Sequence, residues 1–212
     1  MLTACGGSGG GEPATDEPTD TSLSFSLYPA TYFDGSYFES YSQKSVDSNV
    51  SWTVRLGSTI AFNGQPISTI EDALSFTDNS SGVVLSGVLE RYFSTDTNNL
   101  TLVGYYLDFS GVVAMATSVD ILPLTATIGS FGSVGSYSLS DGESEVITWA
   151  LLDGYNGKAR LEITKVTRDS AGALSFTETD TWMINQDGTR LSVTTTVMYH
   201  QSGNKTLIWS PL

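Results

Sequence analysis

The chain has 212 residues, a formal net charge of −14 and a hydrophobic content of 40%, with one cysteine and one histidine. One Cys and one His exclude an intrachain disulfide, a Cys–His dyad and a metal cluster built from these residue types. The acidic charge argues against nucleic acid or an anionic lipid surface as a partner. The length is sufficient for a substantial core in one large or two small domains.

The chain starts with a short motif that ends in the only cysteine, Leu2-Thr3-Ala4-Cys5. This motif resembles the lipobox of bacterial lipoproteins, in which an apolar residue and two small residues precede a lipidated cysteine. The resemblance implies that residues 1–4 are a remnant of a signal peptide and that Cys5 carries the lipid. The residue after the cysteine is Gly6 and not Asp, which in such lipoproteins implies the outer membrane.

The residues after Cys5 have the composition of a linker. Gly6–Gly11 is almost pure glycine, Glu12–Asp20 is rich in acidic residues and proline, and no large apolar residue precedes Leu23. Such a segment cannot bury enough apolar surface to fold. We therefore expect residues 5–22 to be a disordered tether and residues 23–212 to form the folded domain.

From Leu23 onward, apolar residues alternate with polar ones, which is typical of half-buried strands. Examples are Leu23/Phe25/Leu27, Trp52/Val54/Leu56, Leu161/Ile163 and Leu191/Val193. Turn sequences such as Asn63-Gly64 and Asp187-Gly188 separate the alternating runs and favour hairpins. The pattern predicts an all-β fold of about ten to twelve antiparallel strands, in a sandwich or a barrel. The exception is Ser68–Leu74, where Ser68 and Glu71 have capping-box spacing and predict a short helix.

Two parts of the folded domain share an order of motifs. Gly35-Ser36-Tyr37 leads to Trp52, as Gly135-Ser136-Tyr137 leads to Trp149, and Tyr105–Gly111 aligns with Trp182–Gly188. Repeats of this kind arise by duplication. The hypothesis is two halves, 23–120 and 135–212, of about five strands each; chance similarity between aromatic strands is the alternative.

Aromatic residues are the candidate ligand contacts. They make up 11% of the chain and are first expected to fill the core. The residues that we single out for contact with a ligand are Tyr32, Tyr37, Tyr41, Trp52, Tyr105, Trp149 and Trp182. A ligand-holding barrel would have an apolar cavity lined by Leu89 and the last four of these aromatics. The abundance of large side chains instead favours a packed sandwich without much void.

Polar candidates for chemistry are few. The acid pairs Glu143/Glu145 and Glu178/Asp180 have glycosidase-like spacing on a strand, but we expect both to lie on solvated faces. His200 is expected to cap an exposed turn, and the oxygen-rich loop Asp153–Gly157 lacks the acids of an EF-hand. No catalytic residues, metal site or cofactor are therefore predicted.

The sequence thus predicts a non-catalytic β-rich scaffold or binding domain, anchored to the outer membrane by lipid on its periplasmic or surface side. No segment approaches the roughly 20 apolar residues of a spanning helix, so the lipid is the expected membrane contact. The expected partners are an envelope protein, a glycan or a small apolar ligand. Two alternatives stay open, a lipocalin-like carrier of a small apolar ligand or lipid and a surface adhesin or glycan-binding module. The β segments are similar to those of uncharacterised bacterial lipoproteins, which implies no activity.

Overall fold

The computed structural model describes residues 16–44, 48–96, 99–200 and 205–209. These residues form fourteen strands and no helix, which confirms the all-β class. In chain order the strands are β1 (Ser24–Ser26), β2 (Phe38–Lys44), β3 (Ser48–Phe62), β4 (Gln65–Asp78), β5 (Val84–Ser94), β6 (Leu102–Leu107), β7 (Val112–Val119), β8 (Thr125–Thr127), β9 (Phe131–Leu139), β10 (Ser144–Asp153), β11 (Ala159–Arg168), β12 (Leu174–Ile184), β13 (Arg190–Tyr199) and β14 (Lys205–Trp209).

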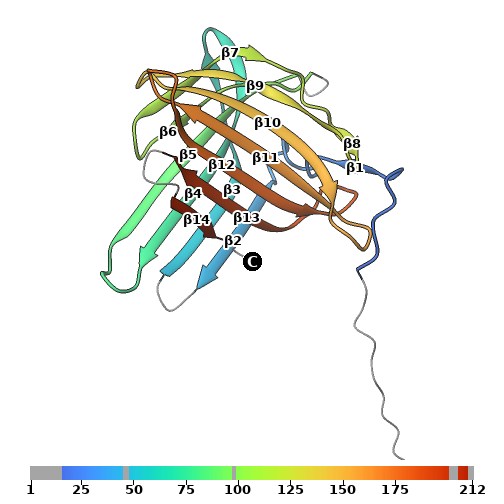
Figure 1. Ribbon diagram of the computed structural model, residues 1–212. Helices are drawn as coiled ribbons and strands as arrows, with labels where there is room; N and C mark the ends of the chain where they lie inside the picture. Colours follow the sequence, from blue (N-terminus) through green and yellow to red (C-terminus); the bar gives the residue numbers. More distant parts are fainter. Residues whose placement is uncertain (1–15, 45–47, 97–98, 201–204, 210–212) are drawn as a thin grey trace, which may run out of the picture.

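Twelve of these strands form one antiparallel sheet that curls into a nearly closed barrel (Figure 1). Each strand pairs with the next one along the chain, except that β8 leaves the sheet to pair with β1, so that β7 pairs with β9. Because all twelve strands belong to one hydrogen-bonded sheet, their inward side chains face a single common interior. The packed two-sheet sandwich favoured by the sequence is therefore wrong, and the barrel alternative is correct.

One end of the barrel is closed by the chain before β2. The amide of Ser26 donates to the carbonyl of Gln186 at 2.8 Å, and the amide of Leu27 donates to the carbonyl of Leu124 at 2.9 Å. Phe25 and Tyr32, which belong to this segment, are fully buried. Residues 23–37 therefore form a plug. We call the end of the barrel that this plug covers the closed end.

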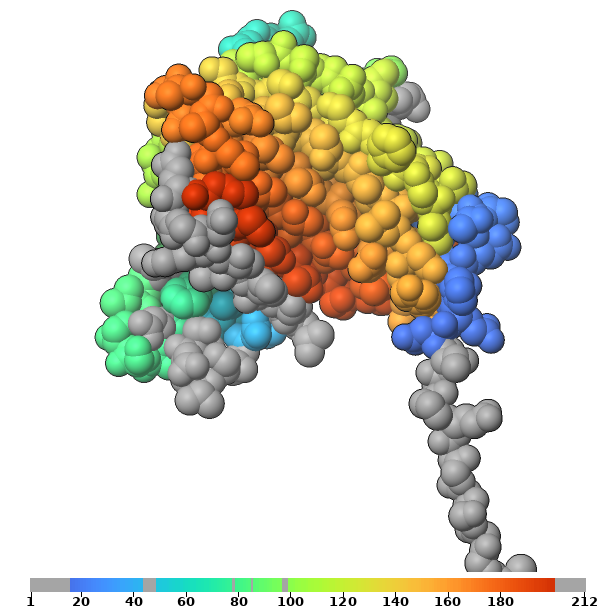
Figure 2. All heavy atoms as spheres, in the orientation of Figure 1, coloured from blue at the N-terminus to red at the C-terminus, as the bar shows by residue number. Residues whose placement is uncertain are grey.

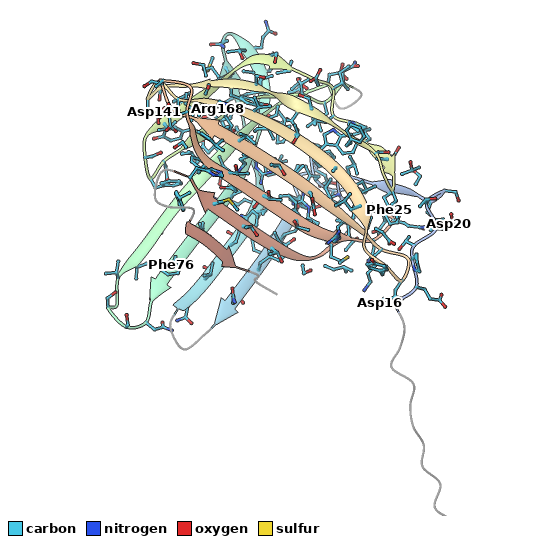
Figure 3. The ribbon with its side chains drawn as sticks, in the orientation of Figure 1. Asp16, Asp20, Phe25, Phe76, Asp141 and Arg168 are labelled. Carbon is cyan, nitrogen blue, oxygen red and sulfur yellow. The ribbon has the colours of Figure 1, made fainter. Side chains whose placement is uncertain are left out.

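The opposite end carries the turns that follow β4, β6, β9 and β11. Figure 3 shows Asp141 and Arg168, which flank two of these turns, far from Phe25 and Asp20 at the closed end. We call this the open end, because no segment comparable to residues 23–37 crosses it among the residues that the structure describes.

The last part of the expected tether is held against the barrel. The amide of Glu17 donates to the side-chain oxygen of Asn156 at 3.1 Å, and the buried Thr19 hydroxyl donates to the carbonyl of Lys158 at 2.8 Å. Figure 2 shows these N-terminal residues, in blue, against residues of the second half of the chain. The prediction of a disordered tether is therefore wrong for residues 16–22, and residues 5–15 lie outside the described part.

The helix predicted over Ser68–Leu74 is also wrong, because this segment lies within β4. Residues 67–77 pair with β5, and most of β4 pairs with β3 on the other side. Ile70, Asp72 and Leu74 follow one another on the inward face. Two ladders of backbone hydrogen bonds and an alternating pattern outweigh the local signal of a capping box.

The two hypothetical halves each contribute six strands to the barrel, β2–β7 and β9–β14. The motif alignment would match Tyr105, on the fifth strand of its half, with Trp182, on the fourth strand of the other. The alignment therefore does not match the halves strand for strand, and duplication stays a hypothesis.

Candidate functional site

The interior of the barrel contains two neighbouring cavities. The larger, about 360 Å³, is lined largely by apolar side chains from both halves of the sheet, including Trp52, Leu89, Leu161, Ile163, Trp182 and Val197. The smaller, about 340 Å³, shares Leu89 and Val197 with it and adds Tyr105. Each volume falls within the roughly 300–1,000 Å³ of small-molecule sites.

The cavities extend towards the open end of the barrel. Leu74, Phe109 and Tyr199 line the larger cavity, and each lies in or close to a turn of that end. All three side chains are exposed to solvent, although apolar residues of this size are usually buried. The open end is therefore the natural entrance.

A buried ion pair forms part of the larger cavity. The Nε and Nη2 atoms of Arg91 donate to the two carboxylate oxygens of Asp72 at 2.6 and 2.5 Å. The indole nitrogen of Trp52 donates to the same carboxylate at 3.2 Å. Burial by itself would lower the pKa of Arg91, but the attraction to Asp72 outweighs it and raises that pKa above its ordinary value.

A second charged group lies on β11 and β12. The Lys165 ammonium contacts the carboxylate of Glu178 and lies 4.0 Å from that of Asp180. Thr195 donates to Asp180 at 2.6 Å. Burial raises the pKa of Asp180 to about 6, and repulsion from Glu178 adds to this rise.

Glu145 is a third buried acid, and the groups that donate hydrogen bonds to its carboxylate are uncharged hydroxyls. It receives hydrogen bonds from the Tyr105 hydroxyl at 2.9 Å and the Thr167 hydroxyl at 3.2 Å, and its side chain lines the smaller cavity. Burial raises the pKa of Glu145. Burial also raises the pKa of Tyr105, so that its hydroxyl keeps the proton it donates.

Near the closed end, Arg190 is enclosed by aromatic rings. Its guanidinium lies 5.1 Å from the ring centre of Tyr32 and 4.8 Å from that of Trp182, distances typical of cation–π contacts. The Nη1 atom of Arg190 also lies 3.4 Å from the carboxylate of Glu39 on β2. This contact connects β13 with β2, which lie at or next to the two opposite edges of the sheet. This cluster is the inner limit of the larger cavity.

The seven aromatic candidates are all buried, but only some reach a cavity. Trp52 and Trp182 line the larger cavity and Tyr105 the smaller one. Trp149 packs instead beside Gly132, where an added Cβ would lie 2.8 Å from the indole nitrogen.

The three remaining candidates lie near the closed end. The rings of Tyr32 and Tyr37 pack together, with centres 4.7 Å apart, and Tyr41 donates to Glu39 at 2.7 Å. Ligand contact by the seven aromatics stays a prediction.

The expectation that both acid pairs lie on solvated faces is wrong for three of the four acids. Glu145 and Asp180 are 3% and 7% exposed, Glu178 is partly buried, and all three line a cavity. The alternation of side chains along a strand predicts that these acids point inward. Glu178 and Asp180 lie on the same face of β12 as Trp182, and Glu145 lies on the same face of β10 as Ile147.

The remaining candidates have ordinary surroundings. His200 shares a hydrogen bond of 3.0 Å with Thr177, and Asp153 accepts the amides of Thr19 and Tyr155 at 3.1 and 2.7 Å. Cys5 lies outside the described residues. Within the described ranges, no three His, Cys, Asp or Glu residues are grouped as metal ligands.

The described residues contain no helix long and apolar enough to cross a membrane. Comparison of the chain with protein-family models, with curated proteins and with solved structures finds no match. The assignment of a function therefore rests on the geometry of the barrel interior.

Proposed function

We propose that this protein is a non-catalytic, lipid-anchored protein of the bacterial outer membrane whose barrel binds a small, largely apolar molecule in its interior. The observation that carries the proposal is the cavity of about 360 Å³ between Leu89, Leu161, Ile163 and the two indoles. Barrels with an unfilled interior of this kind commonly hold one small ligand. The carrier alternative is thus favoured over a purely structural scaffold.

The shape of the barrel supports a binding role. The plug of residues 23–37 covers one end, whereas the cavities extend to the other, so among the described residues the open end offers a ligand a way in. The apolar walls supply the favourable burial, about 25 cal/mol for each Å² of apolar surface removed from water.

The anchor rests on the lipobox at Cys5. Residues 16–22 join the barrel at its closed end, so a chain attached through Cys5 is tied to the membrane from that side. The entrance then faces away from the attachment, where a ligand can reach it.

Ligand binding is tested by titrating decanol into the purified domain while recording tryptophan fluorescence, because Trp52 and Trp182 line the cavity. We expect saturable, micromolar binding to one site. Val197→Phe places a larger side chain in both cavities and should weaken binding roughly tenfold or more. Val146→Phe, at an outward position that is 44% exposed, is the matched control. Decanol binding that is absent, or equal in both variants, would contradict the proposal.

The anchor is tested separately in cells that express the gene with a complete signal peptide. Cys5→Ser removes the only thiol that can accept the lipid. The protein should then move from the membrane fraction to the soluble fraction. Unchanged membrane fractionation would refute the lipid anchor without bearing on ligand binding.

A further inference from the structure

The charged groups of the barrel interior do not balance. Four carboxylates line the two cavities below the rim, those of Asp72, Glu145, Glu178 and Asp180, against the two cations Arg91 and Lys165. Arg190 also borders the larger cavity, but it is shared with Glu39 and the aromatic rings of the closed end. Counted over the described side chains, the interior therefore carries an excess of acid.

Both interior cations are already engaged. Arg91 makes two hydrogen bonds to Asp72, and Lys165 contacts Glu178 and Asp180. Glu145 receives hydrogen bonds from two hydroxyls, and Lys165 attracts its carboxylate without forming a direct ion pair among the described residues, so this one ammonium serves Glu145, Glu178 and Asp180 together. A further positive group in this region would meet carboxylates that the protein's own cations do not neutralise.

The part of the entrance beside the smaller cavity also carries acidic side chains, whereas the exposed Arg168, at the neighbouring β11–β12 turn, lines neither cavity. Asp141 and Glu143 line the smaller cavity at the β9–β10 turn, and among the side chains that the structure describes Arg91 and Lys165 are the basic ones that line it. Clefts lined by one sign of charge concentrate ligands of the opposite sign and repel those of the same sign. A fatty acid would therefore approach an acidic rim and then an acidic interior.

Apolar and aromatic side chains adjoin these carboxylates. Leu107, Ile147 and Val197 line the smaller cavity together with Glu145 and Glu178. Phe109, Phe176 and Tyr199 line it towards the open end, and their rings can stabilise a nearby cation through their faces. A positive group and a hydrocarbon body can thus be accommodated side by side.

From this arrangement we propose that the cavity selects an apolar molecule that carries a protonated amine. The ammonium group lies in the smaller cavity, between the carboxylates of Glu145 and Glu178. The hydrocarbon part extends into the larger cavity along Leu89, Leu161 and Ile163. This inference rests on the proposed binding function and names the chemical class of the ligand.

The direct test compares three probes that share one chain length, decylamine, decanol and sodium decanoate, by tryptophan fluorescence and by calorimetry at neutral pH. We expect decylamine to bind roughly tenfold more tightly than decanol, the factor that corresponds to 1.4 kcal/mol. Decanoate should bind more weakly than decanol.

The role of the carboxylates is tested with Glu145→Gln, which keeps the shape of the side chain and a hydrogen-bond acceptor. It should reduce the preference for decylamine over decanol roughly tenfold, and Glu178→Gln should act in the same direction. Glu162→Gln is the matched control, because it removes the same charge from the outward face of β11, next to the inward Ile163. Circular dichroism and thermal unfolding establish that each variant is folded.

Each outcome separates the inference from the proposed function. If none of the three probes binds, the binding function itself is wrong. If decanol binds but decylamine has no advantage, or if the advantage survives in both glutamine variants, the binding function stands and the amine preference is refuted. An advantage that falls equally in Glu162→Gln would attribute it to net charge, which also refutes the proposed site.

Discussion

Asp72 and Arg91 form a bidentate ion pair inside the barrel, with one side chain from β4 and the other from β5. The preceding residue of β4, Glu71, faces outward and pairs with Arg55, whose side chain is 65% exposed. Two adjacent acids of β4 thus each form an ion pair with an arginine, one in the barrel interior and one on its outer surface. The two pairs allow the effect of burial to be measured within one protein.

Asp72→Asn should destabilise the fold by about 3 kcal/mol, because it leaves the Arg91 charge buried without its partner. Glu71→Gln should cost less than about 1 kcal/mol, since solvent screens the exposed pair. Equilibrium unfolding in urea measures both. Equal losses in the two variants would contradict the placement of Asp72 and Arg91 in the interior.

The elevated pKa of Asp180 predicts a pH-dependent stability. Because its pKa rises from 3.8 to about 6 on folding, the folded state favours the protonated acid, and this group lowers stability as the pH rises through that interval.

Asp180→Asn removes this titration. The variant should therefore gain stability relative to the wild type between pH 4 and pH 7, and the difference should level off above pH 7. Urea unfolding of both proteins across this range provides the measurement. A difference that does not change with pH would show that Asp180 titrates normally.

The fit of the plug at the closed end is tested at Gly188. This glycine has a φ of +83°, and an added Cβ would lie 2.4 Å from the carbonyl oxygen of Tyr28. Gly188→Ala should therefore both strain the backbone and displace the plug. Gly172 has a φ of +82° with nothing within 4 Å, so Gly172→Ala bears only the backbone strain.

We expect Gly188→Ala to lose at least about 1 kcal/mol more than Gly172→Ala. Limited proteolysis should also cut residues 23–37 faster in the Gly188 variant. Equal stability and equal cleavage would mean that the plug does not depend on this close contact.

Local patterns predict much of the strand content, because side-chain alternation and turn chemistry are properties of short segments. Asn63-Gly64 is an example: both residues have positive φ, 50° and 75°, and they join β3 to β4 as the sequence indicates. The choice between sandwich and barrel could not be predicted in this way. Apolar and polar side chains alternate along the strands of a sandwich and of a barrel alike. Only the pairing of strands that lie far apart in the sequence decides whether one sheet curls on itself.

The general tendency of charged residues to face solvent does not predict the polar part of the candidate site, because strand parity turns Glu145, Glu178 and Asp180 inward. The inward orientation of Arg190 could not be predicted either, because it depends on a local irregularity in strand pairing. The register between β12 and β13 shifts beside Arg190 and Ser192, so Arg190 points inward and Leu191 is 41% exposed. Alternation alone assigns Leu191 and Val193 to the same buried face, and a bulge of this kind has no reliable sequence signal.

The central claim, that a small apolar molecule occupies the interior of the barrel, is tested most directly by solution NMR of methyl-labelled protein with bound decanol. Intermolecular nuclear Overhauser effects should connect the decanol chain with the methyl groups of Leu89, Ile163 and Val197, which line the larger cavity. The outward methyl groups of Val119 and Val146 should show none. Contacts confined to those outward groups, or no intermolecular contacts at a saturating concentration of decanol, would contradict the account.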